Sequence, residues 1–123
     1  MSVSICYSQS MYSETRIVKK EELNALAEEV LALAREQKKE GATIVALRGD
    51  LGAGKTTFVQ CLGQALGVSE TITSPTFTIM KGYETTDDTF KHLVHMDAYR
   101  IDDLAELGPL RFEEILCTPQ TLF

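Results

Sequence analysis

The sequence has few cysteines, no long hydrophobic run and a shortage of basic residues, and each of these shortages excludes a class of protein. Its three cysteines are widely spaced and form no C-x-x-C pair, which argues against a disulfide framework or a zinc site and favours reduced thiols. No apolar stretch approaches the ~20 residues of a membrane-spanning helix. The first residues have neither a basic start nor an apolar run, so we expect no secretory signal and a cytoplasmic protein.

Basic residues are outnumbered by acidic ones. The 123-residue chain has 12 Lys and Arg against 18 Asp and Glu, which gives a formal net charge of −6. Because a protein that holds nucleic-acid phosphates needs clustered Lys and Arg, we expect this chain to bind no nucleic acid directly. Its composition, 44% hydrophobic and 24% charged, is otherwise typical of a single globular domain with a buried core.

The hydrophobic pattern predicts an α/β domain preceded by a tail. Residues 1–12 are small and polar without a clear period, so we expect a flexible tail there and one domain over residues 13–123. The expected elements are a short strand over 15–18, a helix over 20–39, a strand over 43–47, a helix over 55–66, strands over 76–83 and 90–96, and short helical segments over 102–107 and 111–116.

Several details of these elements are also predicted. Apolar residues at helical spacing should form the buried face of the first helix; they are Leu23, Leu26, Ala27, Val30, Leu31 and Ala34. Gly41 and Gly67 should end the two longer helices. The apolar run 43–47 predicts a strand buried on both faces, and the short polar link between the strands over 76–83 and 90–96 predicts an antiparallel pair.

A phosphate-binding loop is predicted by the pattern G-x-x-x-x-G-K-[ST], which Gly49, Gly54, Lys55 and Thr56 meet. The pattern follows an expected strand and opens an expected helix, as such a loop requires. Its backbone N–H groups would cradle the phosphates, and the helix N-terminus adds partial positive charge. Lys55 would place its ammonium on the phosphates, and the Thr56 hydroxyl would bind Mg²⁺. The alternative is a plain strand-to-helix turn, for which so many glycines are a costly choice.

Asp97 is the candidate for the second acid that a phosphate-binding loop needs. It follows the expected strand over 90–96, and such an acid holds the metal ion directly or through water. An acid at a strand end is otherwise a cap or turn residue. His95 lies two residues earlier and therefore on the same strand face, so it either orients the acid or is a packed histidine.

Three blocks of this sequence closely resemble the TsaE (YjeE) family: residues 49–57, 74–78 and 95–100. Members of that family are bacterial ATPases needed to make threonylcarbamoyl adenosine in tRNA. The resemblance implies a P-loop NTPase-like three-layer domain with a mixed central sheet, which binds ATP with Mg²⁺. It also implies TsaD- and TsaB-like partners, with the transfer reaction itself carried out by TsaD, and neither direct tRNA binding nor a membrane is expected.

The resemblance also assigns roles to residues. The nucleotide-binding residues that it implies are Gly49, Asp50, Leu51, Gly52, Ala53, Gly54, Lys55, Thr56, Thr57 and Asp97. Among these, Lys55 and Asp97 would be catalytic, and Thr56 and Asp97 would hold the metal. Ser74 and Thr76 would belong to a switch-like loop that senses the γ-phosphate; the alternative is a plain loop that enters a strand. Arg100 would neutralise phosphate charge or contact a partner, or form an ordinary salt bridge.

The family continues beyond this point with a strand that ends in a Glu-Trp pair, whereas the chain turns apolar at residues 121–123 and stops. We therefore expect a truncated domain that lacks its C-terminal strands, has an unpaired sheet edge, and binds nucleotide but hydrolyses it poorly. Two other functions compete with this one. The first is a non-catalytic, nucleotide-dependent interaction module. The second is a small-molecule kinase, for which the C-terminal half offers few arginines to build a lid.

Overall fold

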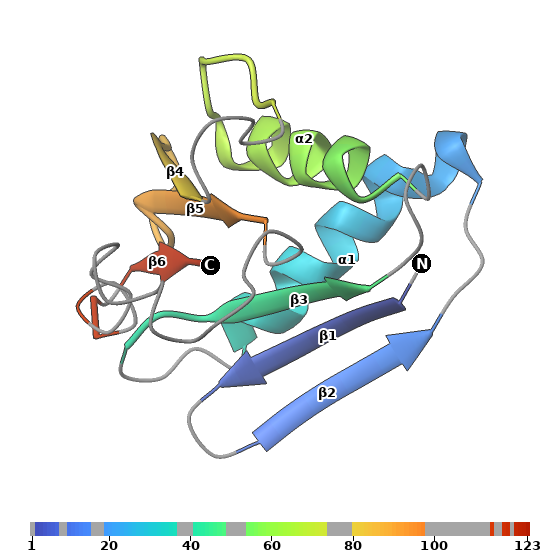
Figure 1. Ribbon diagram of the computed structural model, residues 1–123, viewed down its shortest axis with the longest axis horizontal. Coiled ribbons are helices and arrows are strands. Elements are labelled where there is room, and N and C mark those ends of the chain that lie inside the picture. The colour runs from blue at the N-terminus through green and yellow to red at the C-terminus, as the bar shows by residue number, and fades with distance from the viewer. Residues whose placement is uncertain are drawn as a thin grey trace.

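The structure is a computed structural model. It describes residues 2–7, 10–15, 19–36, 41–48, 54–73, 80–97, 114, 117–118 and 120–123, the first two ranges by their backbone alone. The elements in chain order are β1 (Ser2–Tyr7), β2 (Ser10–Thr15), the 3₁₀ helix η1 (Lys20–Glu22), α1 (Leu23–Glu36), β3 (Ile44–Arg48), α2 (Lys55–Leu66), β4 (Met80–Glu84), β5 (His92–Met96) and β6 (Thr121–Leu122) (Figure 1). Helices and a mixed sheet together make this an α/β fold, as the sequence predicts.

The strands form two three-stranded groups, in the orders β2-β1-β3 and β4-β5-β6. A parallel bridge between Thr43 and Leu122 joins them, and three backbone hydrogen bonds support it. The Thr43 and Val45 amides donate to the Thr121 and Phe123 carbonyls at 2.9 and 2.7 Å, and the Phe123 amide donates to the Thr43 carbonyl at 2.7 Å. The strand β6 therefore lies between β3 and β5.

Strand directions decide which ends of the strands meet. The pair β5 and β6 is parallel, and so is the bridge from β6 to β3, while β4 runs antiparallel to β5 as predicted. The arrowheads of β3 and β5 accordingly point the same way in Figure 1. The carboxyl ends of these two strands therefore lie at the same edge of the sheet.

The first helix begins with a local cap and buries the predicted face. The Lys19 amide donates to the Glu22 carboxylate at 2.9 Å, which fixes the turn that precedes α1. All six predicted residues of α1 are buried, from Leu23 to Ala34. Gly41 has a left-handed φ of 81°, but residues 37–40 lie outside the described part, so the last predicted turn of this helix stays a prediction.

The second helix, α2, has the predicted bounds. It runs from Lys55 to Leu66 and ends at Gly67, whose φ of 78° is left-handed, the conformation that glycine adopts most easily. Phe58 and Leu62 are buried and join α1 in one core with Phe90, Leu93 and other apolar residues. Full burial of such a side chain stabilises the fold by about 1.5–3 kcal/mol.

Two predictions about the strands are wrong. The flexible tail expected over residues 1–12 is instead a hairpin of β1 and β2, and β1 also pairs antiparallel with β3. The strand β3 is not buried on both faces, because Ala46 and Arg48 are exposed while Val45 and Leu47 pack against the core. The core covers one face of this strand only, so its side chains alternate between two environments.

Most of the predicted strand over 15–18 and the helical segments over 102–107 and 111–116 fall outside the described residues. Within the described part, no helix combines the length and the apolar character that crossing a membrane requires.

Candidate functional site

The candidate site begins at the N-terminal end of α2. Gly54 occupies the position before the helix with a φ of 96°, and as a glycine it has no side chain with which to cap the helix. Among the described residues, a Cβ atom added to Gly54 would meet nothing within 4 Å. Within the described part of the chain, the backbone at this end is therefore open to a close approach, and its left-handed conformation favours glycine.

The first helical hydrogen bond of α2 runs from the Phe58 amide to the Gly54 carbonyl at 2.9 Å. The amides of Lys55, Thr56 and Thr57 precede this bond, so they point out of the N-terminal end of the helix. The side chains of these three residues are half-buried. The N-terminal end of α2 thus combines backbone amides, the positive end of the helix dipole and a lysine. Such an environment stabilises an anion.

The acid predicted for the site lies at the same edge of the sheet. Asp97 is half-buried and directly follows β5. The carboxyl ends of β5 and β3 lie at the same edge of the sheet, and β6 lies between these two strands. The chain that leaves β3 leads to the start of α2. In open α/β sheets, ligands bind outside the carboxyl ends of parallel strands. The topology thus assigns the start of α2 and Asp97 to one edge.

His95 lies on β5, two residues before Asp97. Its Nδ1 atom is buried and makes no hydrogen bond within the described part of the chain. Burial lowers the pKa of His95 below its ordinary value, while the Asp97 charge and a hydrogen bond to the Thr73 backbone act in the opposite direction. The imidazole is therefore neutral near pH 7 and adds no positive charge to this edge.

Several predicted site residues cannot be placed. Those that lie outside the described residues are Gly49, Asp50, Leu51, Gly52, Ala53, Ser74, Thr76 and Arg100. The structure therefore places Gly54, Lys55, Thr56, Thr57 and Asp97 and leaves the rest of the loop as a prediction. Among described residues, no group of three or more His, Cys, Asp or Glu could hold a metal ion.

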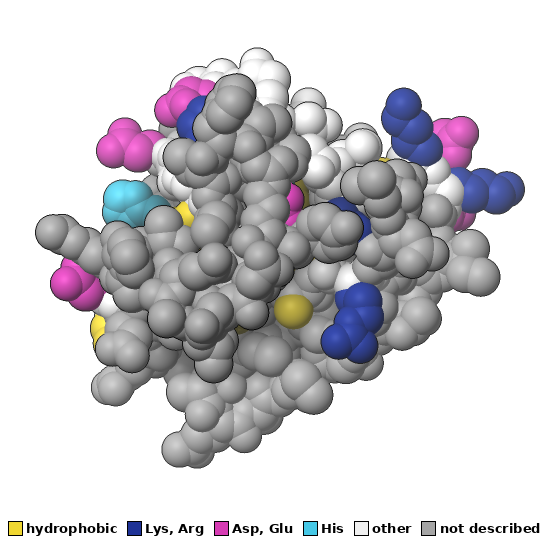
Figure 2. Space-filling view, viewed as in Figure 1, with side chains coloured by type: hydrophobic (Ala, Val, Ile, Leu, Met, Phe, Trp, Pro, Cys, Tyr) yellow, Lys and Arg dark blue, Asp and Glu magenta, His cyan; other side chains and the backbone are white. Residues whose placement is uncertain are grey.

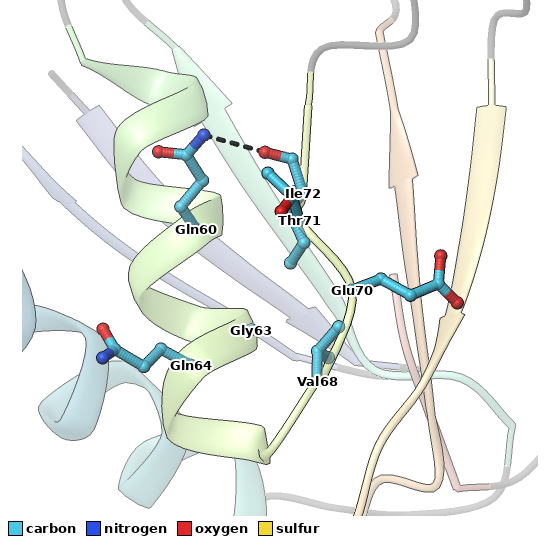
Figure 3. A pocket seen from close by; sticks show the side chains of 7 residues that line it. All are labelled: Gln60, Gly63, Gln64, Val68, Glu70, Thr71 and Ile72. Carbon is cyan, nitrogen blue, oxygen red and sulfur yellow. Dashed lines mark hydrogen bonds between the residues drawn. The ribbon is translucent and has the colours of Figure 1, made fainter.

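A pocket of about 370 Å³ lies farther along α2 (Figure 3). Its lining residues are Gln60, Gly63, Gln64, Val68, Glu70, Thr71 and Ile72. The Glu70 side chain extends away from α2, so the polar groups do not converge on one point (Figure 3). This pocket offers no clear ligand site of its own.

One contact in this region has no counterpart in the sequence-based predictions. The Gln60 amide nitrogen donates to the Ile72 carbonyl at 2.8 Å. Nothing in the spacing of Gln60 and Ile72 marks them as partners, because the contact joins a helix to an irregular segment. Only the three-dimensional arrangement shows it.

The visible surface is mixed in charge. In the described part of the face in Figure 2, acidic and basic side chains lie both at the rim and nearer the centre, and they do not gather into one basic patch.

The fold and the site define an α/β protein in which a helix N-terminus and an acid share one edge of the sheet. The model of the family described as "Threonylcarbamoyl adenosine biosynthesis protein TsaE" matches residues 17–123. The chain therefore belongs to the TsaE family.

Individual relatives agree with this assignment. The chain is 42% identical over 91 residues to the "tRNA threonylcarbamoyladenosine biosynthesis protein TsaE" of Bacillus subtilis, a match that covers 74% of this chain and 52% of the relative. The protein of the same name from Aquifex aeolicus is 42% identical over 95 residues, 76% of this chain and 65% of the relative. The protein of the same name from Synechocystis is 50% identical over 62 residues, a match that covers 50% of this chain and 38% of the relative. The chain thus matches between about a third and two thirds of these relatives' lengths.

Proposed function

We propose that this chain binds ATP with Mg²⁺ at the N-terminal end of α2, and that it acts as an ATP hydrolase in threonylcarbamoyl adenosine modification of tRNA. The observation that carries the binding proposal is the start of α2, where no described residue blocks a close approach to the backbone at Gly54 and Lys55 follows at once. The role in tRNA modification rests on membership of the TsaE family and on the names of the relatives. TsaD- and TsaB-like proteins are the proposed partners.

The residues present fit a nucleotide with a magnesium ion. Backbone amides, a lysine ammonium and a helix N-terminus are the groups that bind phosphate. Mg²⁺ prefers oxygen ligands, and the Thr56 hydroxyl and the Asp97 carboxylate would supply two of them. When bound, the metal would neutralise charge on the phosphate oxygens.

Each residue would make a separate contribution to the reaction. The first amides of α2 would orient the phosphates, and Lys55 would hold them through its ammonium. Thr56 and Asp97 would fix the metal from the helix and from the strand, respectively. Because phosphoryl transfer relies mainly on positioning and on charge stabilisation, these are the contributions that the protein has to make.

Titration calorimetry with ATP and Mg²⁺ tests the binding site. We expect the unmodified chain to bind, and Lys55→Ala to weaken binding about 10- to 100-fold through the lost charged hydrogen bonds. Lys20→Ala is the matched control, because Lys20 is exposed and lies at the start of η1. A chain that melts cooperatively yet binds no nucleotide, or a Lys55→Ala variant that binds normally, would contradict the proposal.

Turnover is tested next, with TsaD- and TsaB-like proteins added to the chain. Phosphate release that requires Lys55 supports the hydrolase role. Tight binding without phosphate release, even with the partners present, would favour the non-catalytic interaction module instead.

A further inference from the structure

The segment at Ile72 and Thr73 lies between the two elements that carry the candidate site. Ile72 is buried, and it packs against α2 at Gly63. A Cβ atom added to Gly63 would lie 2.1 Å from Cδ1 of Ile72 and 3.6 Å from Cδ2 of Leu93, which belongs to β5. The missing side chain of Gly63 therefore lets Ile72 fit closely where α2 approaches β5.

Polar contacts hold the same two residues from both sides. From α2, Gln60 donates to the Ile72 carbonyl at 2.8 Å, the bond drawn in Figure 3. From β5, the imidazole of His95 forms a hydrogen bond with the Thr73 backbone. Two consecutive residues of one irregular segment thus connect the helix to the strand. We refer to these two contacts as the 72–73 bridge.

The bridge is close in sequence to the candidate metal ligands on both elements. Gln60 lies about one helical turn after Thr56, and His95 lies two residues before Asp97 on the same strand face. A shift of α2 relative to β5 would change the separation of the Thr56 hydroxyl and the Asp97 carboxylate. A misplacement of about 1 Å is enough to weaken a site that depends on two converging ligands.

We propose that Gln60 and His95 are positioning residues, which fix Thr56 relative to Asp97 through the 72–73 bridge and thereby set how much Mg²⁺ strengthens ATP binding. This inference rests on the proposed function. It assigns to Gln60 and His95 no contact with the nucleotide. The bridge affects only the gain in ATP affinity that Mg²⁺ provides. The amides and the lysine at the start of α2 belong to one rigid helix, so their contacts with phosphate do not depend on the bridge.

The test compares ATP affinity with Mg²⁺ and with EDTA in Gln60→Met and Gln64→Met. Both glutamines are exposed on α2 one turn apart, and methionine keeps their length and helix propensity without a donor. We expect Gln60→Met to reduce the gain in affinity from Mg²⁺ about three- to tenfold, with affinity in EDTA unchanged. Gln64→Met should change neither value. An unchanged gain in Gln60→Met, or an equal loss in both media, would overturn the proposal.

Substitutions of His95 test the other side of the bridge. His95→Leu removes the donor to Thr73 and should reduce the Mg²⁺ gain to a similar extent. His95→Gln retains an N–H donor and should restore most of it. If both variants behave alike, His95 does not position Asp97 through Thr73, and the proposal is wrong for that residue.

Amide hydrogen exchange of residues 68–73 without nucleotide separates this inference from the proposed function. Faster exchange in Gln60→Met and His95→Leu, but not in Gln64→Met, is expected if the bridge holds the segment. Unchanged exchange in both Gln60→Met and His95→Leu would show that the bridge does not hold the segment, whatever the result for nucleotide binding. If the folded, unmodified chain binds no ATP, the proposed function fails, and the role of the bridge in metal binding fails with it.

Discussion

The two ends of α2 are built from the same kind of residue and yet have opposite surroundings. Gly54 precedes the helix with a φ of 96°, and Gly67 follows it with a φ of 78°. A Cβ atom on Gly67 would lie 1.9 Å from Oγ1 of Thr86, whereas one on Gly54 would meet no described residue within 4 Å. One end is closed by packing and the other is open.

Hydrogen bonds follow the same division. At the closed end, the Gly67 and Val68 amides bond to carbonyls of the last turn, and the Thr86 amide donates to the Leu66 carbonyl at 3.1 Å. At the open end, Gly54 has no side chain with which to cap the helix. A left-handed glycine at a helix end therefore has two distinct uses: to allow neighbouring chain to pack, or to leave the backbone accessible. The geometry of the glycine itself does not distinguish them.

The largest expected effect is on stability, from Gly67→Ala. The added methyl group combines an unfavourable left-handed backbone with a collision at Thr86, so we expect a loss of about 2–4 kcal/mol in the free energy of unfolding. Urea denaturation measures it. Adding Thr86→Ala removes the colliding oxygen and should recover about 1 kcal/mol. If the double variant recovers nothing, steric packing is not what distinguishes this end.

A smaller effect is expected from Gly54→Ala, and on a different property. The methyl group meets open space, so the stability loss should be limited to backbone strain of about 1–2 kcal/mol. Nucleotide binding should weaken about tenfold or more, because the methyl group occupies the space that a phosphate would need. Calorimetry with ATP and Mg²⁺ measures this. Equal effects of Gly54→Ala and Gly67→Ala on binding by folded protein would remove the contrast between the two ends.

The smallest expected effect concerns the turn that contains Thr86 and Asp87 and packs against Gly67. Burial raises the pKa of Asp87, but hydrogen bonds from Phe90, Arg35 and Thr89 together hold that pKa below its ordinary value. A carboxyl with a lowered folded-state pKa contributes stability above the unfolded-state pKa, near 3.8, and loses it as the pH falls through the folded-state value. We therefore expect Asp87→Asn to lower the free energy of unfolding by about 0.5–1 kcal/mol at pH 7.

The difference between Asp87→Asn and the unmodified chain should shrink as the pH falls below about 4, which urea denaturation at several pH values would show. Asp88→Asn is the matched control, since Asp88 is exposed and only approaches Lys91 at 3.8 Å. A pH-independent difference for Asp87→Asn would mean that its charge does not stabilise the turn.

Local chemistry explains what was predictable from the sequence. The bounds of α2, the end at Gly67 and the buried face of α1 follow from apolar spacing and from the preferences of glycine, both of which are local properties. The antiparallel pair β4 and β5 follows from its short connection. The position of Asp97 directly after β5 follows from the strand-like run that precedes it.

Contacts between distant segments explain what was missed. The hairpin of β1 and β2 has no apolar period, and its pairing with β3 depends on a strand far along the chain. The exposure of Ala46 depends on which face of β3 the core covers. The bond from Gln60 to Ile72 joins a helix to irregular chain, and no sequence spacing encodes such a contact.

The connection between the two groups of strands has a consequence for the order of folding. Thr43 and Thr121 are hydrogen-bonded although they lie about eighty positions apart in the sequence. Their pairing closes a large loop, and the loss of conformational entropy precedes the stabilising contact. The hairpins β1–β2 and β4–β5 need only short loops and should form first. The parallel pairing of β6 with β3 should then be a late step. It brings together the group of strands that leads to α2 and the group that leads to Asp97. In such a sequence the candidate site is among the last parts of the molecule to assemble.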